Sequence, residues 1–442
     1  MSDVPDQGPP DDTSGGHADG ADCSCAEYSS ATSSRRSFLS TALAVAGGTV
    51  ATSLFGDTFR QTAYGQQAAG NVMVVLSLRG GADGLSLVVP HGDHHYYAQR
   101  PRIAVPKGSL LFKDAMFGLH PGFKPLATLW KQKRFAAVHA VGLPQPNRSH
   151  FSAIEEIEDA DLGSAARVGW INRLVGLDAQ RNALQAVSVG SGVMPTSLYG
   201  NEPTISIEAV DSVTLSGAQL QASTRRARRR ALDQVWGHSK SPLARGARAS
   251  LATTSALAGT LSHRYRPAHG AAYPVGSLGD ALKDTARLIK ARVGVEVVTL
   301  DYGSWDMHSK LGTVRVGGAE SMRGMVGTLS HALAAFFTDL GTVGGRVTLV
   351  TLTEFGRRLK ENGSGGLDHG WANATLVMGA GVRGGRYHGT WPGLANAALD
   401  DGDLAVTTDY RSILSEIMLK RFNTTSSKVF PDFTPKHVGV MH

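Results

Sequence analysis

The feature that most constrains this chain is its alternation of short apolar segments with helical ones. Apolar segments at 71–78, 135–141, 295–300 and 347–352 predict buried strands, and 374–378 predicts a fifth. Helical patterns lie between or after them, at 154–161, 282–292, 319–340 and 409–421. The near-continuous apolar character of the strands is typical of a sheet covered on both faces. The alternation therefore predicts an α/β fold with a mostly parallel sheet flanked by helices.

Polar side chains follow each of the first four predicted strands at its carboxyl end. In open α/β sheets, ligands bind beyond this end of the strands. Because these ends meet at one edge of a parallel sheet, we expect the side chains to form one site.

The N-terminal region is typical of an export signal. Arg35 and Arg36 precede an uncharged run to Phe55, which is the twin-arginine signature. The run is short and rich in small residues, so it does not predict a spanning helix. We expect 1–65 to be removed, the twin-arginine translocase to be a partner during export, and the product to be periplasmic or extracellular. The mature chain, folded over 70–442, has no segment long enough to span a membrane.

Loss of this region changes both the charge and the available ligands. Residues 1–65 carry a net charge of −5, so their removal raises the net charge from +7 to +12. Such a basic exported protein is expected to meet anionic substrates or polymers, and nucleic acid is not expected. Cys23 and Cys25 also lie in this region, so a metal site must use oxygen and nitrogen ligands.

An arginine-rich stretch interrupts the α/β pattern at 209–274 and predicts a helical insertion. Five of the six residues at 225–230 are arginines. They could form an anion-binding surface, although a solvated helix face is the favoured interpretation of such a run.

Acids and histidines after the strands are candidate ligands of a divalent cation. Asp83 lies in a glycine-rich turn that leaves its carboxylate open to a cation, or it belongs to an ordinary turn. Asp306 and His308 lie on the same side of an extended segment. Asp368 and His369 are adjacent, so they serve two metals, or one binds and the other supports it. Zinc is the expected ion, with manganese, magnesium and calcium as alternatives.

The loop before the first long helix could hold an anion or a nucleophile. Ser152 and Glu155 fit a capping box, which predicts Ser152 as the helix N-cap. Ser149 would then lie free in the loop as a candidate nucleophile, with Arg148 as an anion clamp. Alternatively, the loop serine and the next histidine only organise the loop. Secondary candidates for the site are Asp301, Glu354, Arg357, His150 and His388.

Five short motifs together resemble one family of twin-arginine-exported bacterial proteins of unknown function. They lie at 80–84, 147–151, 305–308, 354–357 and 366–370. The family is grouped with the alkaline phosphatase and sulfatase superfamily, and the resemblance covers 72–421.

The resemblance implies an alkaline-phosphatase-like fold and a two-metal hydrolase of phosphate or sulfate esters. It implies Asp83 as the first metal carboxylate and Ser149 as the nucleophile. It also implies ligands of one metal at 306 and 308 and of the other at 368 and 369. Because no cysteine remains to become formylglycine, serine-dependent phosphate chemistry is favoured over sulfatase chemistry. The alternative is a catalytically silent binding protein for cell-surface polyanions or an exported partner.

Overall fold

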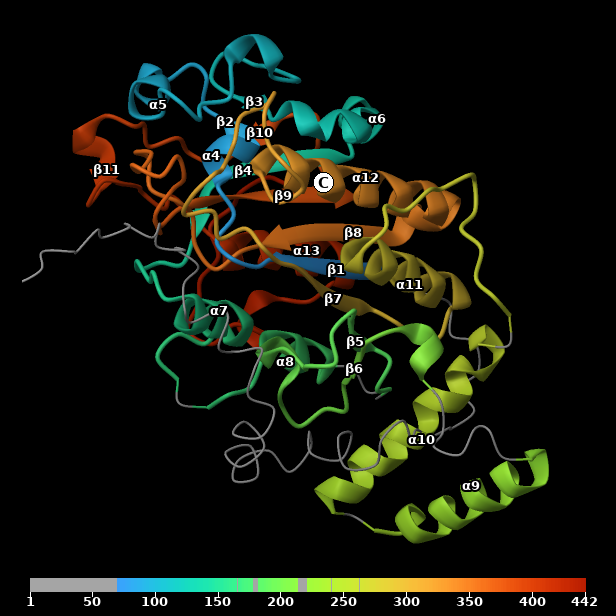
Figure 1. The fold of residues 1–442 in the computed structure, drawn as a ribbon. Coiled ribbons are helices and arrows are strands. Elements are labelled where there is room, and N and C mark those ends of the chain that lie inside the picture. The colour runs from blue at the N-terminus through green and yellow to red at the C-terminus, as the bar shows by residue number, and fades with distance from the viewer. Residues whose placement is uncertain (1–69, 165, 178–181, 214–220, 240, 262) are drawn as a thin grey trace, which may run out of the picture.

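A computed structural model describes residues 70–164, 166–177, 182–213, 221–239, 241–261 and 263–442. The predicted export signal at 1–65 lies outside the described residues. Within them, one large mixed sheet is flanked by helices on both faces (Figure 1).

The sheet confirms the predicted, mostly parallel architecture. Its strand order is β10 (Tyr387–His388), β4 (Phe135–Gly142), β9 (Asn373–Gly379), β8 (Val347–Leu352), β1 (Val72–Leu78), β7 (Val297–Tyr302), β5 (Ala186–Val189) and β6 (Ile205–Ile207), and β13 (Thr408–Asp409) also pairs with β4. Only β9 runs antiparallel to its neighbours β4 and β8; the other pairings are parallel. All five predicted strands are present. The short β5 and β6 were not predicted.

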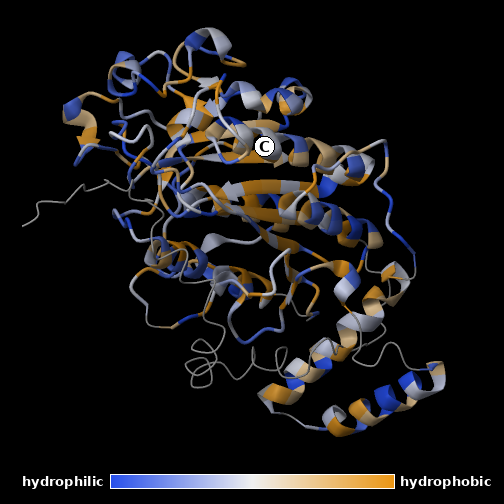
Figure 2. Cartoon of the chain, in the orientation of Figure 1, coloured by the Kyte–Doolittle hydropathy of each residue, from blue (hydrophilic) through white to orange (hydrophobic). Residues whose placement is uncertain are grey.

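Each face of the sheet has its own core. On one side α11 (Ser277–Ala291) and α12 (Met322–Leu340) pack on the alternate β1 residues that begin with Val72. On the other side α7 (His150–Asp159), α8 (Trp170–Val175) and α13 (Tyr410–Phe422) pack around Met73 and Val75. Strands buried on both faces explain the continuous apolar runs in the sequence, which Figure 2 shows as the hydrophobic centre of the molecule.

Shorter elements complete the described fold around the edges of the sheet. The remaining α-helices are α4 (Gly84–Leu87), α5 (His94–Gln99) and α6 (Ala127–Lys131). Two small antiparallel pairs are β2 (Val88–Val89) with β3 (Gly118–Leu119), and β11 (Leu399–Asp400) with β12 (Asp403–Leu404). The 3₁₀ turns are at Lys107–Ser109, Pro121–Leu126, Thr196–Leu198, Val210–Ser212, Gly341–Arg346, Asn396–Ala398 and Ser426–Lys428.

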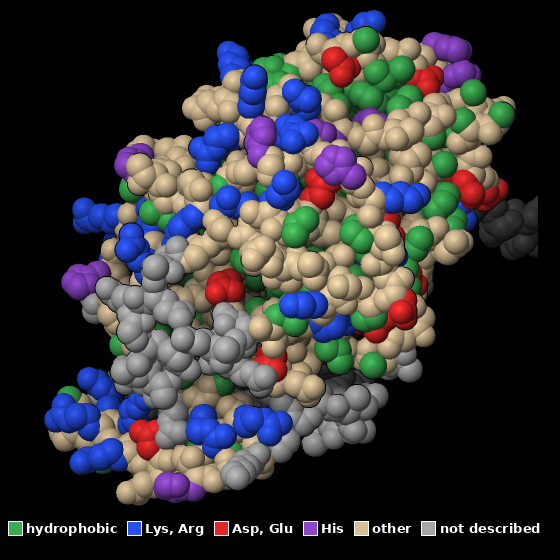
Figure 3. Space-filling view, turned by 180° about the vertical axis from the view of Figure 1, so that it is seen from behind, with side chains coloured by type: hydrophobic (Ala, Val, Ile, Leu, Met, Phe, Trp, Pro, Cys, Tyr) green, Lys and Arg blue, Asp and Glu red, His purple; other side chains and the backbone are tan. Residues whose placement is uncertain are grey.

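The arginine-rich stretch contains two helices that extend away from the sheet (Figure 1). They are α9 (Ala222–Gly237), which buries no residue, and α10 (Pro242–Leu261). Arg229 donates to the Leu251 carbonyl at 3.1 Å, so one arginine of the run anchors α9 on α10. Basic side chains gather on these helices at the lower left of Figure 3. Among the described helices, none has the length and apolar character needed to cross a membrane.

Two buried histidines should make the fold sensitive to acid. Burial lowers the pKa values of His120 and His139 to about 4, so both are neutral in the folded protein at neutral pH. In the unfolded chain they take up protons below about pH 6.5. The pKa difference therefore has no effect on stability above pH 6.5 and destabilises the folded protein as the pH falls towards 4, by up to about 3 kcal/mol for each histidine.

Chemical denaturation of metal-free protein at pH 7 and pH 4.5 measures this effect. His139 stacks on Phe117 with ring centroids 4.4 Å apart, so phenylalanine is a conservative replacement at this position. We expect His139→Phe to reduce the acid loss of stability, and the exposed His94→Gln to leave it unchanged. An equal loss in His139→Phe and the parent would contradict the assignment.

Candidate metal centre

A cluster of histidines and acids lies beyond the carboxyl ends of four parallel strands. The loop after β1 provides Gly80 and Gly81, and the loop after β4 leads to His150. The loop after β7 provides Asp306 and His308. The single long loop between β8 and β9 provides the rest of the cluster, Glu354, Arg357, Asp368 and His369. The sheet edge therefore joins groups that are more than 200 residues apart in sequence.

Three imidazole rings direct the same nitrogen toward one another. The Nε2 atom of His369 lies 3.1 Å from Nε2 of His150 and 2.9 Å from Nε2 of His308. His150 is buried, whereas the other two rings are each 16% exposed, so solvent reaches the cluster from one side.

The opposite nitrogen of each ring faces an oxygen that can only accept a hydrogen bond from it. Nδ1 of His150 contacts Glu354 Oε1 at 3.1 Å, and Nδ1 of His308 contacts Asp368 Oδ1 at 3.2 Å. Nδ1 of His369 contacts the Arg148 carbonyl at 2.8 Å. Each Nδ1 must therefore carry a proton, which leaves the Nε2 lone pair of each neutral ring pointing into the cluster.

The Asp306 carboxylate completes this cluster. Its Oδ1 lies 3.1 Å from His308 Nε2 and 3.3 Å from His369 Nε2, and its Oδ2 lies 3.5 Å from His150 Nε2. Burial alone would raise the pKa of Asp306. In the metal-free protein, hydrogen bonds from histidine Nε2 atoms that have taken up a proton, together with the charge of Arg357, lower it far below its usual range. Asp306 is therefore ionised at neutral pH.

The arrangement fits a divalent cation. Atoms of His150, Asp306 and His369 all lie within 4.8 Å of one another, and His308 Nε2 adjoins the last two. Ligands about 2.0–2.1 Å from a zinc ion lie roughly 3 Å apart, which matches the separations of 2.9–3.5 Å seen here. Without a cation, the lone pairs of neighbouring Nε2 atoms would repel one another, so some of these atoms must bind protons instead. Accordingly, although burial opposes it, hydrogen bonds to the two acids raise the pKa of His150 to about 9.

Glu354 contacts both the turn after β1 and one ligand ring of the centre. Its buried carboxylate accepts hydrogen bonds from the Gly80 and Gly81 amides at 2.6 and 3.1 Å as well as from His150. Both glycines have positive φ, and a Cβ on Gly80 would lie 2.7 Å from the Asp306 amide nitrogen. The glycines of this turn are therefore required to bring the backbone against the centre, and Glu354 fixes both the turn and a ligand ring.

Arg357 adds a fixed positive charge beside the centre. It donates to Asp306 Oδ1 at 2.5 Å and to the Gly81 and Leu367 carbonyls at 2.6 and 3.1 Å. Its guanidinium is 1% exposed, so it holds the loops together and compensates the Asp306 charge.

Several expected site residues are placed elsewhere. The Asp83 carboxylate, expected to hold a metal, is instead paired with the fully buried Arg100 at 2.5 and 3.0 Å. Asp301 pairs with Arg79 at 3.0 Å, and His388 contacts the Arg383 carbonyl at 2.8 Å. Their oxygen and nitrogen atoms thus have partners outside the cluster, and the sequence pattern could not distinguish these roles.

Helix α7 begins earlier in the sequence than predicted. Helix α7 begins at His150 with Ser149 at the N-cap position, so the prediction of Ser152 as N-cap was wrong. Asn147 explains the difference, because its side chain accepts from the Ser149 amide and donates to the Ser152 hydroxyl. The Ser149 side chain makes no capping hydrogen bond. In the sequence, Ser149 lies between Arg148, whose carbonyl contacts His369, and the cluster residue His150.

Two parts of the site were missed in the sequence. Asn362 donates to Asp368 Oδ1 at 3.0 Å, and nothing in its local sequence indicates this. The turn at Asp401 and Gly402 carries carboxylates to Arg148 and Arg358. This Asp-Gly pair is a strong hairpin signal that could have been used.

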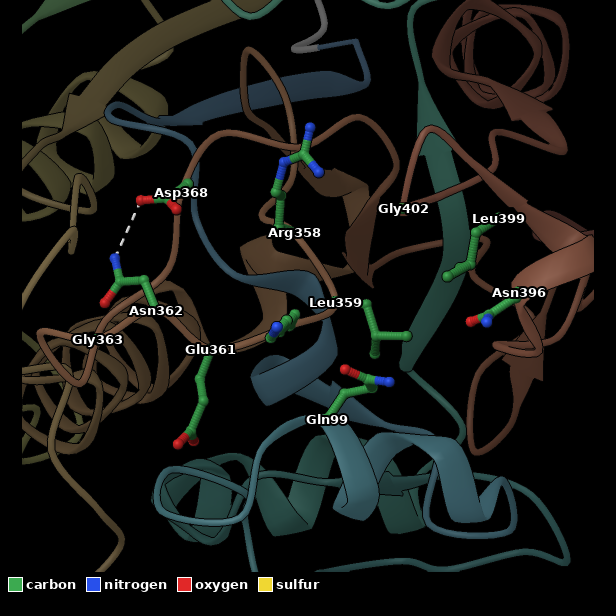
Figure 4. Close-up of a pocket in the computed structure, with 11 residues that line it drawn as sticks. Gln99, Arg358, Leu359, Glu361, Asn362, Gly363, Asp368, Asn396, Leu399 and Gly402 are labelled. Carbon is green, nitrogen blue, oxygen red and sulfur yellow. Dashed lines mark hydrogen bonds between the residues drawn. The ribbon is translucent and has the colours of Figure 1, made fainter.

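A cleft of about 440 Å³ adjoins the centre at Asp368 (Figure 4). Its polar lining includes Gln99, Arg358, Lys360, Asn362 and the acid Glu361, and Leu359 and Leu399 add apolar surface. A ligand in this cleft would meet cationic and amide groups next to the metal-supporting acid.

Comparisons with solved structures found only distant likenesses. The chain is similar to the C-terminal periplasmic domain of EcEptC from Escherichia coli in complex with Zn, at 9% identity and a TM-score of 0.36 over 86% of this chain and 91% of that one. It is also similar to the lipoteichoic acid synthase LtaP from Listeria monocytogenes, at 7% identity and a TM-score of 0.33 over 75% and 71%. A third is a protein in the alkaline phosphatase superfamily from Vibrio parahaemolyticus, at 11% identity and a TM-score of 0.32 over 73% and 63%. No curated protein matches the sequence.

The sequence itself matches one family. The match spans residues 141–414, which include the three histidines, Asp306, Glu354 and Arg357 of the cluster. The chain belongs to the family described as "Protein of unknown function (DUF1501)".

Proposed function

We propose that this protein is an exported, metal-dependent hydrolase acting on phosphate or sulfate esters. The observation that carries the proposal is the convergence of three histidine Nε2 atoms on the Asp306 carboxylate, with each Nδ1 fixed by an oxygen. Zinc is the ion that best suits this nitrogen-rich set. Export by the twin-arginine translocase is part of the proposal and rests on Arg35 and Arg36.

Each residue of the cluster has a separate role in the proposed function. His150, His308, His369 and Asp306 would hold the ion, which would supply Lewis-acid polarisation of the ester. Glu354 and Asp368 hold two of the rings in the ligating tautomer, and Arg357 compensates the carboxylate charge.

Ser149 is the proposed nucleophile. It directly precedes the ligand residue His150 at the start of α7, and its hydroxyl is not used as a cap. A hydroxyl next to a metal can lose its proton more readily than one in water. The cleft beside Asp368, with Arg358 and Lys360, would receive the anionic ester.

Replacing Ser149 with alanine tests the proposal. We expect zinc-loaded protein to hydrolyse an aryl phosphate or aryl sulfate, and Ser149→Ala to lower kcat at least 1,000-fold with metal content unchanged. Ser152→Ala, which removes a hydroxyl from the first turn of the same helix, is the matched control and should keep full turnover. Equal turnover by Ser149→Ala and its parent would remove Ser149 as the nucleophile, and no turnover of any ester by metal-loaded protein would refute the hydrolase.

The second candidate is a catalytically silent binding protein for cell-surface polyanions or an exported partner. The observation that favours it is the completeness of the centre, since four protein groups already surround the ion position and Arg357 adjoins Asp306. Such closed sites are typical of structural zinc. Full metal occupancy without hydrolysis, together with retention on an anionic polymer, would favour this function.

A further inference from the structure

Arg148 and Arg358 flank the metal centre and direct their guanidinium groups at the same oxygen. Nη2 of Arg148 lies 3.3 Å from Asp401 Oδ2, and Nη2 of Arg358 lies 3.2 Å from that same atom. One carboxylate oxygen thus bridges two arginines that come from loops 210 residues apart. Convergent guanidinium groups of this kind are the usual means of binding a phosphate or sulfate group.

Both arginines are joined to the centre through their backbones. The Arg148 carbonyl accepts the Nδ1 proton of His369 at 2.8 Å. The Arg358 amide donates to the Asp368 carbonyl at 3.0 Å. These backbone contacts fix the position of both arginines relative to a proposed metal ligand and its supporting acid.

The two aspartates of the hairpin differ in how firmly they are held. Asp403 is fully buried and contacts Nε and Nη2 of Arg148 at 3.1 and 2.5 Å, so it fixes that arginine. Asp401 is 72% exposed and occupies the tip of the turn between β11 and β12. An exposed ion pair contributes little stability, so a dianion could displace Asp401 at little cost, while Asp403 remains in place.

The hairpin also borders the cleft. Leu399 and Gly402 line it on one side, Asp368 lines it on the other, and Arg358 lies between them (Figure 4). The residues at the tip, Asp401 and Gly402, both have positive φ, which gives a tight two-residue turn. Displacement of Asp401 would therefore open the side of the cleft on which Arg358 is presented.

We propose that Arg148 and Arg358 form a binding site for the phosphate or sulfate group of the substrate, and that Asp401 occupies this site in the free protein. The assignment of the anion as a substrate rests on the proposed function. The anion site itself does not, because it uses no metal ligand side chain. Asp401 thus acts as an internal competitor that a substrate must displace.

Titration of metal-free protein with inorganic phosphate, and separately with inorganic sulfate, tests the site by calorimetry. Asp401→Asn keeps the shape of the side chain and tolerates positive φ, but removes the competing charge. We expect it to lower the Kd for the preferred anion by about 2–5-fold. Adding Arg358→Gln to this variant should reverse the gain. Asp432→Asn is the matched control, an exposed aspartate that also has positive φ, and should leave Kd unchanged.

Two outcomes would overturn the proposal. One is an unchanged Kd in Asp401→Asn, and the other is tight binding that survives Arg358→Gln. Ester hydrolysis by metal-loaded protein separates this result from the proposed function. If hydrolysis occurs but KM is the same in parent, Asp401→Asn and Arg358→Gln, the anion site is wrong and the hydrolase stands. If Asp401→Asn tightens anion binding but no ester is hydrolysed, the anion site stands and the hydrolase is wrong.

Discussion

Replacing His369 with alanine is expected to reduce bound zinc from about one equivalent per chain to a trace. Nε2 of this ring contacts both other histidines and Asp306, so its removal takes away the shared member of the ligand set. Loss of an outer partner of a ligand costs 10–100-fold in metal affinity, and loss of a ligand should cost more. Elemental analysis after dialysis against buffer with micromolar zinc measures the effect, and turnover should fall with the metal.

Thermal unfolding with and without zinc gives an independent readout. A ligand at 100 times its Kd stabilises the folded state by about 2.7 kcal/mol, so zinc should raise the Tm of the parent and leave His369→Ala unchanged. His388→Ala is the matched control, because this histidine contacts the Arg383 carbonyl and not the cluster. Asp368→Asn, which alters the Nδ1 partner of His308, should weaken zinc binding by about 10–100-fold. Retention of zinc by His369→Ala would refute the centre.

Replacing Arg100 with methionine is expected to destabilise the fold by about 3–5 kcal/mol. The guanidinium of Arg100 is fully buried and pairs with Asp83, which is 3% exposed. It also donates to the Leu359 and Arg358 carbonyls at 2.8 and 3.0 Å. The substitution leaves a buried carboxylate without its cation, and the cost of that charge is the main reason for the large effect.

A double variant separates the charge from the packing. Arg100→Met combined with Asp83→Leu removes both charges, so it should be less destabilised than Arg100→Met alone. Urea denaturation of the two single variants, the double variant and the parent measures the coupling. Zinc content should be normal in folded Asp83→Asn, which tests whether Asp83 is structural. Zinc loss in Asp83→Asn without unfolding would restore it as a ligand.

Local patterns in the sequence determined the main strands and helices. The strands β1, β4, β7, β8 and β9 are mostly apolar because both faces of the sheet are covered, and this composition is visible without a structure. The sequence also predicted that the polar groups after these strands form one site, because the carboxyl ends of parallel strands meet at one edge of the sheet. Asp306, His308, Asp368 and His369 were named in this way, and the structure brings all four together.

The pairing of each polar group depended on tertiary structure. Asp83 and Glu354 both follow buried strands, yet Asp83 is bound by Arg100 while Glu354 holds two glycine amides and a ligand histidine. The difference arises from which cation or N–H group the fold brings within about 3 Å, and neighbours in sequence do not reveal it. For the same reason, the bridge from Asp401 to Arg148 and Arg358 has no local signature. The sequence alone therefore determined the sheet and the edge where polar groups gather. Only tertiary structure decided which of them meet, because the partners lie from 17 to more than 200 residues apart and are brought together by the path of the chain.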